Sequence, residues 1–265
     1  MIDMRLFLTL FLLASCAVGR ADTVVKTHSV ITDTGAAPNV QSPSEHRDVR
    51  YRRGAMRRKD SLGDGEAALI SNIANCDTKT GSLIDLKARE YRTYKVVRFW
   101  PIAQLDDYLQ KNPHDAVQIE SKTIETGERK MFFNHSAKHF ITTTRRSPDE
   151  KDAGGEETID GWYIEHEAPD NNCAPDFVRS EPYYVVGTAL VMPPQIAQFH
   201  HTGPVPSGLA VKLTVIHKIK GSKGTPDRIL TTEETVEELS DSPLNPSLFE
   251  LPPGFSENSH LLGGR

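Results

Sequence analysis

Hydrophobic and polar residues alternate along most of this chain, which is the pattern of strands with one buried face. The clearest case is LAVKLTVIHKIK, residues 209–220, where Leu213, Val215 and His217 share one face while Lys212 and Lys218 fall on the other. The same alternation predicts strands at 23–33, 48–58, 67–76, 116–126, 130–144 and 161–167. Turn signals separate these segments at Asp64-Gly65, Thr80-Gly81, Thr126-Gly127, Gly154-Gly155 and residues 221–226.

Helical patterns are scarce. Residues 102–110 follow Pro101 and predict one short amphipathic helix. Residues 231–239, TTEETVEEL, combine Glu with Thr and Val, so propensity leaves both helix and strand open there. Strands without intervening helices indicate a mainly β protein with an antiparallel sheet, rather than a doubly wound α/β fold.

The start of the chain has the pattern of an export signal. Arg5 precedes the apolar run 6–13, which is too short to span a bilayer, and small residues follow it. Two cleavage sites fit this leader: one after Ala21, and one before Cys16, because Leu13-Ala14-Ser15-Cys16 resembles a bacterial lipobox. The signal is therefore expected to be 1–21, or a lipoprotein signal ending at 15. Both place the protein in the periplasm, and a lipidated Cys16 places it on the outer membrane.

Two of the three cysteines, Cys76 and Cys173, stay in the mature chain whichever cleavage occurs. In an oxidising compartment we expect them to form a disulfide. Such a bond closes a long loop and contributes about 4 kcal/mol in the chain-entropy description. Two separate buried thiols are the alternative.

The formal net charge of −5, together with export, excludes a general nucleic-acid-binding role. Charge is nonetheless uneven, because residues 47–59 carry a local positive excess. This basic strand contains Arg47, Arg50, Arg52, Arg53, Arg57 and Arg58. We expect either a solvated strand face or a surface that contacts anionic phospholipid headgroups.

Ten histidines raise the question of a metal site. His135 and His139 are four residues apart on a predicted strand, which separates them by roughly 13 Å and prevents them from sharing one ion. His166, His200 and His201 form the basis of an alternative, a zinc-dependent hydrolase. No nucleophile, base and orienting residue can be assembled from the sequence, so no catalytic residue, metal or cofactor is expected.

The C-terminal motif NPSLFELPPGF, residues 245–255, resembles the end of an uncharacterised family of bacterial exported proteins. That family is related to the lipoprotein-carrier (LolA-like) fold. Agreement extends to YRRGAMRRKD, CDTKTGSLIDLKAREYRTY, TGERKMFFNHSAKHFITTT and DGWYIE, and covers most of 22–255. The resemblance implies a curved antiparallel half-barrel with one or two short helices, and a strand at 228–240. One domain over 22–255 and a disordered tail at 256–265 are expected.

The function expected from the strands, the leader and the resemblance is binding of a lipid, an acyl chain or a lipoprotein in an apolar concavity, without covalent chemistry. The candidate cavity residues are Trp100, Phe133, Trp162, Val215, His217 and Phe249. For His217 the alternative is a satisfied core histidine, and for Phe249 it is a structural plug at the open end of the sheet. The alternative function is a structural or interaction protein of the envelope, with side chains filling the sheet.

Overall fold

The computed structural model describes residues 22–34, 43–63, 67–95, 110–113, 116–146, 155–166, 183–186, 195–220 and 227–258. Several expectations lie outside these residues: the leader with Cys16, Trp100, Cys173, nearly all of the helix expected at 102–110, and the end of the tail. The domain boundaries likewise stay predictions.

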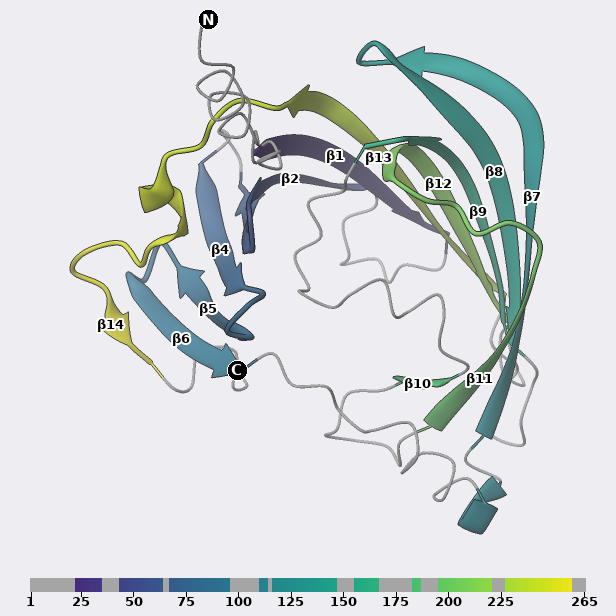
Figure 1. The fold of residues 1–265 in the computed structure, drawn as a ribbon. Coiled ribbons are helices and arrows are strands. Elements are labelled where there is room, and N and C mark those ends of the chain that lie inside the picture. Colours follow the sequence, from purple (N-terminus) through teal and green to yellow (C-terminus); the bar gives the residue numbers. More distant parts are fainter. Residues whose placement is uncertain are drawn as a thin grey trace, which may run out of the picture.

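In the described part of the chain, fourteen strands form one sheet, in the order β10-β11-β7-β8-β9-β12-β13-β1-β2-β3-β4-β5-β6-β14. Their bounds are β1 (Thr23–Asp33), β2 (Ser44–Arg53), β3 (Met56–Leu62), β4 (Ala68–Asn75), β5 (Thr80–Asp85), β6 (Glu90–Lys95), β7 (Ala116–Phe132), β8 (His135–Arg146), β9 (Gly155–Ile164), β10 (Tyr183–Val186), β11 (Gln195–Thr202), β12 (Leu209–Ile219), β13 (Arg228–Ser240) and β14 (Ser256–Glu257). The sheet is open and strongly curved, with β4–β6 at one end of the arch and β7, β8 and β11 at the other (Figure 1). The predicted mainly β, curved sheet is confirmed.

Pairing is antiparallel except at two places. β11 lies parallel to β7, and β14 lies parallel to β6. Both parallel strands join their neighbours after long stretches of chain, as parallel pairing requires, whereas most antiparallel pairs are hairpins of consecutive strands. The antiparallel pairs β9–β12 and β13–β1 join strands that are distant in the sequence. The sheet is therefore antiparallel as expected, and the two parallel pairs are additions that involve only β11 and β14.

Two predicted strands are in fact hairpins. Residues 48–58 fold back at Gly54-Ala55 to give β2 and β3, and residues 130–144 fold back at Phe133-Asn134, where both φ angles are positive. A two-residue turn of this kind suits the twist of antiparallel strands, and Asn tolerates its conformation well. Thr126-Gly127, predicted as a turn, is a bulge inside β7 between Glu125 and Arg129.

The segment 231–239 is a strand, because it lies within β13 between β12 and β1. The strand that the resemblance implied at 228–240 is therefore confirmed. Thr80-Gly81, also predicted as a turn, opens β5, and the turn occupies residues 76–79. Among the described residues, no helix has the length and apolar character needed to span a membrane.

The two faces of the sheet are distinguished by the C-terminal segment. The 3₁₀ turn η3 (Pro246–Phe249) packs on one face of β3–β6, where Phe249 joins Ile73 and Ile84 in a buried cluster. Figure 1 shows this segment on the outside of the curve, so we call that face the outer face and the opposite one the inner face. Because directly paired residues share a face, the strand register extends both definitions across the whole sheet.

A second core lies where β1, β8, β9, β12 and β13 meet. Its buried members are Val25, Ala137, Ile164, Leu209, Val211 and Val236. Two register shifts fall in this area, at Ala210–Lys212 of β12 and at Lys26–Thr27 of β1. Bulges increase local twist, so these irregularities help to bend the sheet around this core.

Candidate functional site

The inner face of β8, β9 and β12 carries an apolar patch, with Lys138 at one end and the His217–Glu157 pair at the other. Phe140 and Tyr163 meet edge to face with ring centroids 5.7 Å apart, and the register places Ile159, Leu213 and Val215 on the same face. Phe140 and Tyr163 are 6% and 7% exposed, whereas Ile159, Leu213 and Val215 are only half-buried. We call these five residues the apolar region, and its half-buried members are the ones a ligand can reach.

Gly161 shapes the apolar region. A Cβ atom at this position would lie 2.6 Å from the Tyr163 ring and 2.7 Å from a Leu213 methyl group. The Tyr163 ring and the Leu213 side chain therefore occupy the space above Gly161 that a side chain would fill. A larger side chain would force the ring or the leucine away.

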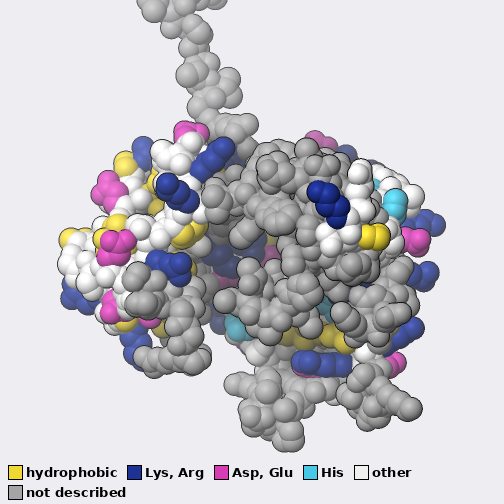
Figure 2. Space-filling view, turned by 90° about the horizontal axis from the view of Figure 1, so that it is seen from below, with side chains coloured by type: hydrophobic (Ala, Val, Ile, Leu, Met, Phe, Trp, Pro, Cys, Tyr) yellow, Lys and Arg dark blue, Asp and Glu magenta, His cyan; other side chains and the backbone are white. Residues whose placement is uncertain are grey.

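The inner face of β2 and β3 is basic. Register pairs Arg50 with Lys59 and Arg52 with Arg57, so two cation–cation pairs lie one after the other on the same face. Figure 2 shows Lys and Arg side chains deep in the hollow between the two halves of the molecule. We call Arg50, Arg52, Arg57 and Lys59 the cationic region. The expected concavity is thus apolar on one side and charged on the other.

Carboxylates contact two members of the cationic region. Arg50 donates to Glu234 at 3.4 Å, and Lys59 lies 2.9 Å from Asp48. Arg57 donates to the backbone carbonyls of residues 54 and 56 at 2.6 and 2.9 Å. β1 and β13 separate the cationic region from β12, a spacing of roughly 14 Å along the sheet.

The outer face carries a groove beside η3. A cavity of about 640 Å³ lies between Phe249 and the strands β3–β6, with Ile73, Thr93 and Lys95 among its lining residues. A second cavity of about 520 Å³ also touches Phe249 and is lined by Arg53 and Pro246 as well. Phe249 itself is buried against Ile73 and Ile84 on the outer face, so it is not part of the inner concavity.

The six arginines of the basic strand do not form one surface. Arg47, Arg53 and Arg58 lie on the outer face, where they pair with Glu237, Asp22 and Asp60. Arg50, Arg52 and Arg57 lie on the inner face. Because the hairpin turns the run back on itself and alternation splits it, the geometry gives no support to a flat membrane-contacting face.

The structure does not gather the predicted cavity residues. Val215 and His217 share the inner face, but Trp162 is paired with Lys212 and His139 on the outer face. Phe133 forms the β7–β8 turn, and Phe249 packs against the far side of the sheet. His217 is not a core histidine, because its side chain is 41% exposed and pairs with Glu157 at 3.1 Å.

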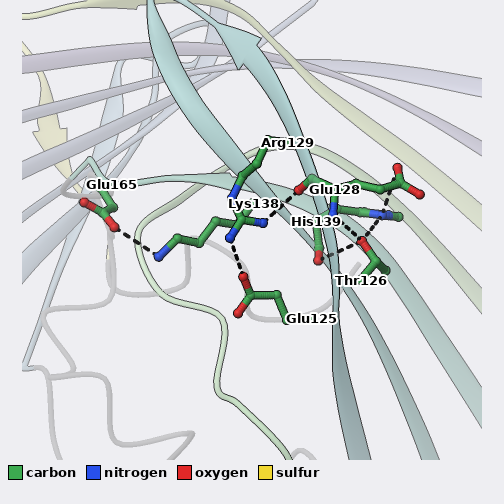
Figure 3. A network of polar contacts seen from close by, with 7 residues as sticks. All are labelled: Glu125, Thr126, Glu128, Arg129, Lys138, His139 and Glu165. Carbon is green, nitrogen blue, oxygen red and sulfur yellow. Dashed lines mark hydrogen bonds and ion pairs between the residues drawn. The ribbon is translucent and has the colours of Figure 1, made fainter.

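A polar network that sequence reasoning missed surrounds His139. Its ring stacks on the Trp162 ring, with the ring centroids 4.5 Å apart. Its Nε2 atom forms a hydrogen bond with the Asp160 carboxylate at 2.8 Å, and its Nδ1 atom forms one with the Thr126 hydroxyl at 3.0 Å. Figure 3 shows His139 with Thr126 and Glu128 from the bulge of β7, beside the pairs Arg129–Glu125 and Lys138–Glu165. The bulge aims Thr126 at the ring, which the turn expected at 126–127 would not have done.

The histidines of the zinc alternative are dispersed. His166, just after β9, bonds Asp241 at 3.0 Å. His201 lies on β11, three strands away from β9, and contacts Ser121 at 3.3 Å. In the described ranges, no group of three or more His, Cys, Asp or Glu side chains is arranged to hold a metal ion. Cys76 is disulfide-bonded, and because its expected partner Cys173 lies outside the described residues, the pairing stays a prediction.

No protein-family model matches this chain, and no curated protein matches it. Among solved structures, an uncharacterised conserved protein from Thermus thermophilus is similar with a TM-score of 0.35 and 8% identity, covering 88% of this chain and 89% of that one. PNGF-II is similar with a TM-score of 0.33 and 10% identity, covering 90% of this chain but only 32% of PNGF-II. Lipoprotein LppX from Mycobacterium tuberculosis is similar with a TM-score of 0.26 and 10% identity, covering 83% of this chain and 88% of LppX. Similarities at this level carry no argument about function.

Proposed function

We propose that this is an exported, non-enzymatic protein that binds an amphiphilic lipid, acyl chain or lipid-bearing protein on the inner face of its curved sheet. The proposal rests on one observation, the apolar region on β8, β9 and β12 inside the curve. Half-buried Leu213, Val215 and Ile159 offer apolar surface that a chain can cover. Covering about 200 Å² of it would contribute about 5 kcal/mol.

The proposal includes no covalent step and no cofactor. Its support is the apolar region, which offers a surface for hydrophobic contact. The His139 network does combine a hydroxyl, an imidazole and a carboxylate, but Thr126 Oγ1 also accepts the Glu128 backbone N–H at 3.2 Å. That bond explains the hydroxyl as a support of the bulge.

The test is binding of a fluorescent fatty acid, followed by lipid extraction from protein purified from a native host. We expect saturable binding and a co-purifying lipid. Val215→Asp, which places a charge in the apolar region, should weaken binding about tenfold or more. Ile216→Asp is the matched control, because the neighbouring residue of the same strand points to the outer face; it should leave binding unchanged. Equal binding by both variants, or none by the parent protein, would refute the proposal.

A second candidate is a structural or interaction protein of the envelope. The observation that favours it is the deep burial of Phe140 and Tyr163, which shows that part of the inner face is already filled. Under this alternative, the fluorescent fatty acid does not bind, and chemical cross-linking in the native host captures a protein partner through the outer groove.

A further inference from the structure

The cationic region departs from ordinary strand pairing. Like charges placed directly opposite each other on neighbouring strands are destabilising. Here Arg50 faces Lys59, and the next inner pair, Arg52 and Arg57, is again cationic. Two such pairs in succession concentrate four positive charges on one side of a single hairpin.

The outer face of the same hairpin shows the ordinary arrangement. There Val49 is paired with Asp60, and Tyr51 with Arg58, whose guanidinium lies over the tyrosine ring and bonds Asp60 at 2.7 Å. The many arginines of this hairpin therefore do not by themselves force like charges to face each other, because on the outer face Arg58 lies beside a tyrosine ring and a carboxylate. The inner pairs are a local cost, and such costs are typical of functional sites.

Two members of the cationic region can take up a further acceptor. Arg50 and Lys59 are 27% and 36% exposed, so an incoming group can reach them. The Arg50–Glu234 contact of 3.4 Å is longer than the roughly 2.7–2.9 Å of a strong charge-assisted bond. A guanidinium and an ammonium also carry several N–H donors each, so both groups can keep their carboxylates and still donate to a ligand. Arg52 is only 1% exposed, and its charge acts in a poorly solvated setting where electrostatic interactions are strong.

We propose that Arg50 and Lys59 bind an anionic oxygen group, a phosphate or carboxylate, with Arg52 and Arg57 strengthening the field behind them. Guanidinium and ammonium groups form their strongest hydrogen bonds with such oxyanions. This inference rests on the proposed function, and it names the ligand class as an anionic amphiphile. The head lies on β2 and β3, and the chain extends across β1 and β13 toward the apolar region.

The test compares lipids that share the same acyl chains and fluorophore. Phosphatidylglycerol should bind about tenfold more tightly than phosphatidylcholine at low ionic strength, and the difference should shrink in high salt. Equal affinities would overturn the inference while leaving the proposed function intact. Absence of binding by both lipids would overturn the proposed function instead.

The variant Arg50→Gln/Lys59→Gln should remove the preference for the anionic lipid and keep the affinity for phosphatidylcholine. Arg47→Gln is the control, because it removes an arginine of the same strand from the outer face, where it pairs with Glu237. Lys59→Arg keeps the charge and should retain the preference. Loss of preference in the Arg47→Gln variant would show a nonspecific charge effect and refute the assignment.

Inorganic phosphate distinguishes a lipid headgroup from a free ion. Competition of millimolar phosphate with phosphatidylglycerol, but not with phosphatidylcholine, supports an oxyanion site within a lipid site. Binding of phosphate by calorimetry with no lipid binding at all would keep the anion site and reject the lipid. No effect of phosphate on phosphatidylglycerol binding would place the headgroup elsewhere and overturn the inference.

Discussion

Two tyrosine hydroxyls are held in settings that disfavour their charged form. Burial raises the pKa of Tyr94, whose phenol donates to Asn72 at 2.6 Å, and the hydrogen bond with that amide partly opposes the effect. Burial also raises the pKa of Tyr51, with the neighbouring Asp60 carboxylate adding to it. Both phenols are therefore more easily deprotonated in the unfolded chain than in the folded one.

The stability contributed by these phenols is fully present below about pH 10, the ordinary tyrosine value, and is lost as the pH rises through the raised folded values. We expect the urea midpoint of unfolding to fall above that pH. Tyr94→Phe should reduce the fall, because phenylalanine has no proton to lose. Tyrosinate absorbance in the near ultraviolet gives the titration directly, and a Tyr94 midpoint at or below the ordinary value would contradict the assignment.

Glu156 behaves in the opposite sense. Hydrogen bonds from Lys218 and Arg145 lower the pKa of this exposed carboxylate on the outer face. Its contribution is present above the ordinary carboxyl range and is lost as the pH falls through the lowered folded value. In the Glu156→Gln variant, the free energy of unfolding should therefore fall less steeply than in the parent protein as the pH is lowered from neutral to acidic values. Glu165→Gln, which changes a more exposed carboxylate paired with Lys138, should leave that fall unchanged.

At the scale of elements, the bulge in β7 depends on Thr126. Its hydroxyl accepts from the Glu128 N–H at 3.2 Å and contacts the His139 ring at 3.0 Å. Thr126→Val keeps the shape but loses both interactions, so we expect a loss of about 1–2 kcal/mol in unfolding free energy. Thr143→Val, on the same outer face of β8, is the control and should change stability by less than about 0.5 kcal/mol. Equal effects in both variants would contradict the role of the hydroxyl.

The strands were predictable because the alternation of hydrophobic and polar residues is local. Their ends were harder to predict, because several nearby sites offer residues that suit a turn. Thr126-Gly127 has the stronger turn signal, yet the chain reverses at Phe133-Asn134, where Asn adopts a positive φ and Phe133 packs on the second core. Tertiary burial thus outweighed the local preference. Residues 231–239 also follow their surroundings, because pairing with β1 on one side and β12 on the other makes a strand of a segment that propensity leaves ambiguous.

The candidate site was predictable in kind but not in composition. Val215 could be assigned to the inner face from its alternation, but Trp162 could not, because bulges shift the register between β9 and β12. The cationic region could be predicted only if the turn at Gly54-Ala55 was recognised, because that turn brings Arg52 opposite Arg57. With the turn placed, YRRGAMRRK itself contains the signal.

At the scale of the molecule, the disulfide at Cys76 ties the turn before β5 to another part of the chain. We expect a Cys76–Cys173 peptide in a non-reducing digest. Reduction should lower the unfolding free energy by about 4 kcal/mol, because the closed loop is long. A Cys76 peptide linked to Cys16 would contradict this pairing and also exclude lipidation of Cys16.

An arch, unlike a closed barrel, has two edge strands, and β14 covers the beginning of the edge at β6. This short strand and the residue after it donate to the backbone along β6, from the Ser256 N–H to the Arg89 carbonyl and from the Asn258 N–H to the Tyr91 carbonyl. A chain shortened before Ser256 would leave those carbonyls open to a neighbouring molecule. Such a chain should associate edge to edge into fibrils that bind thioflavin, because the contacts of Ser256 and Asn258 would be missing.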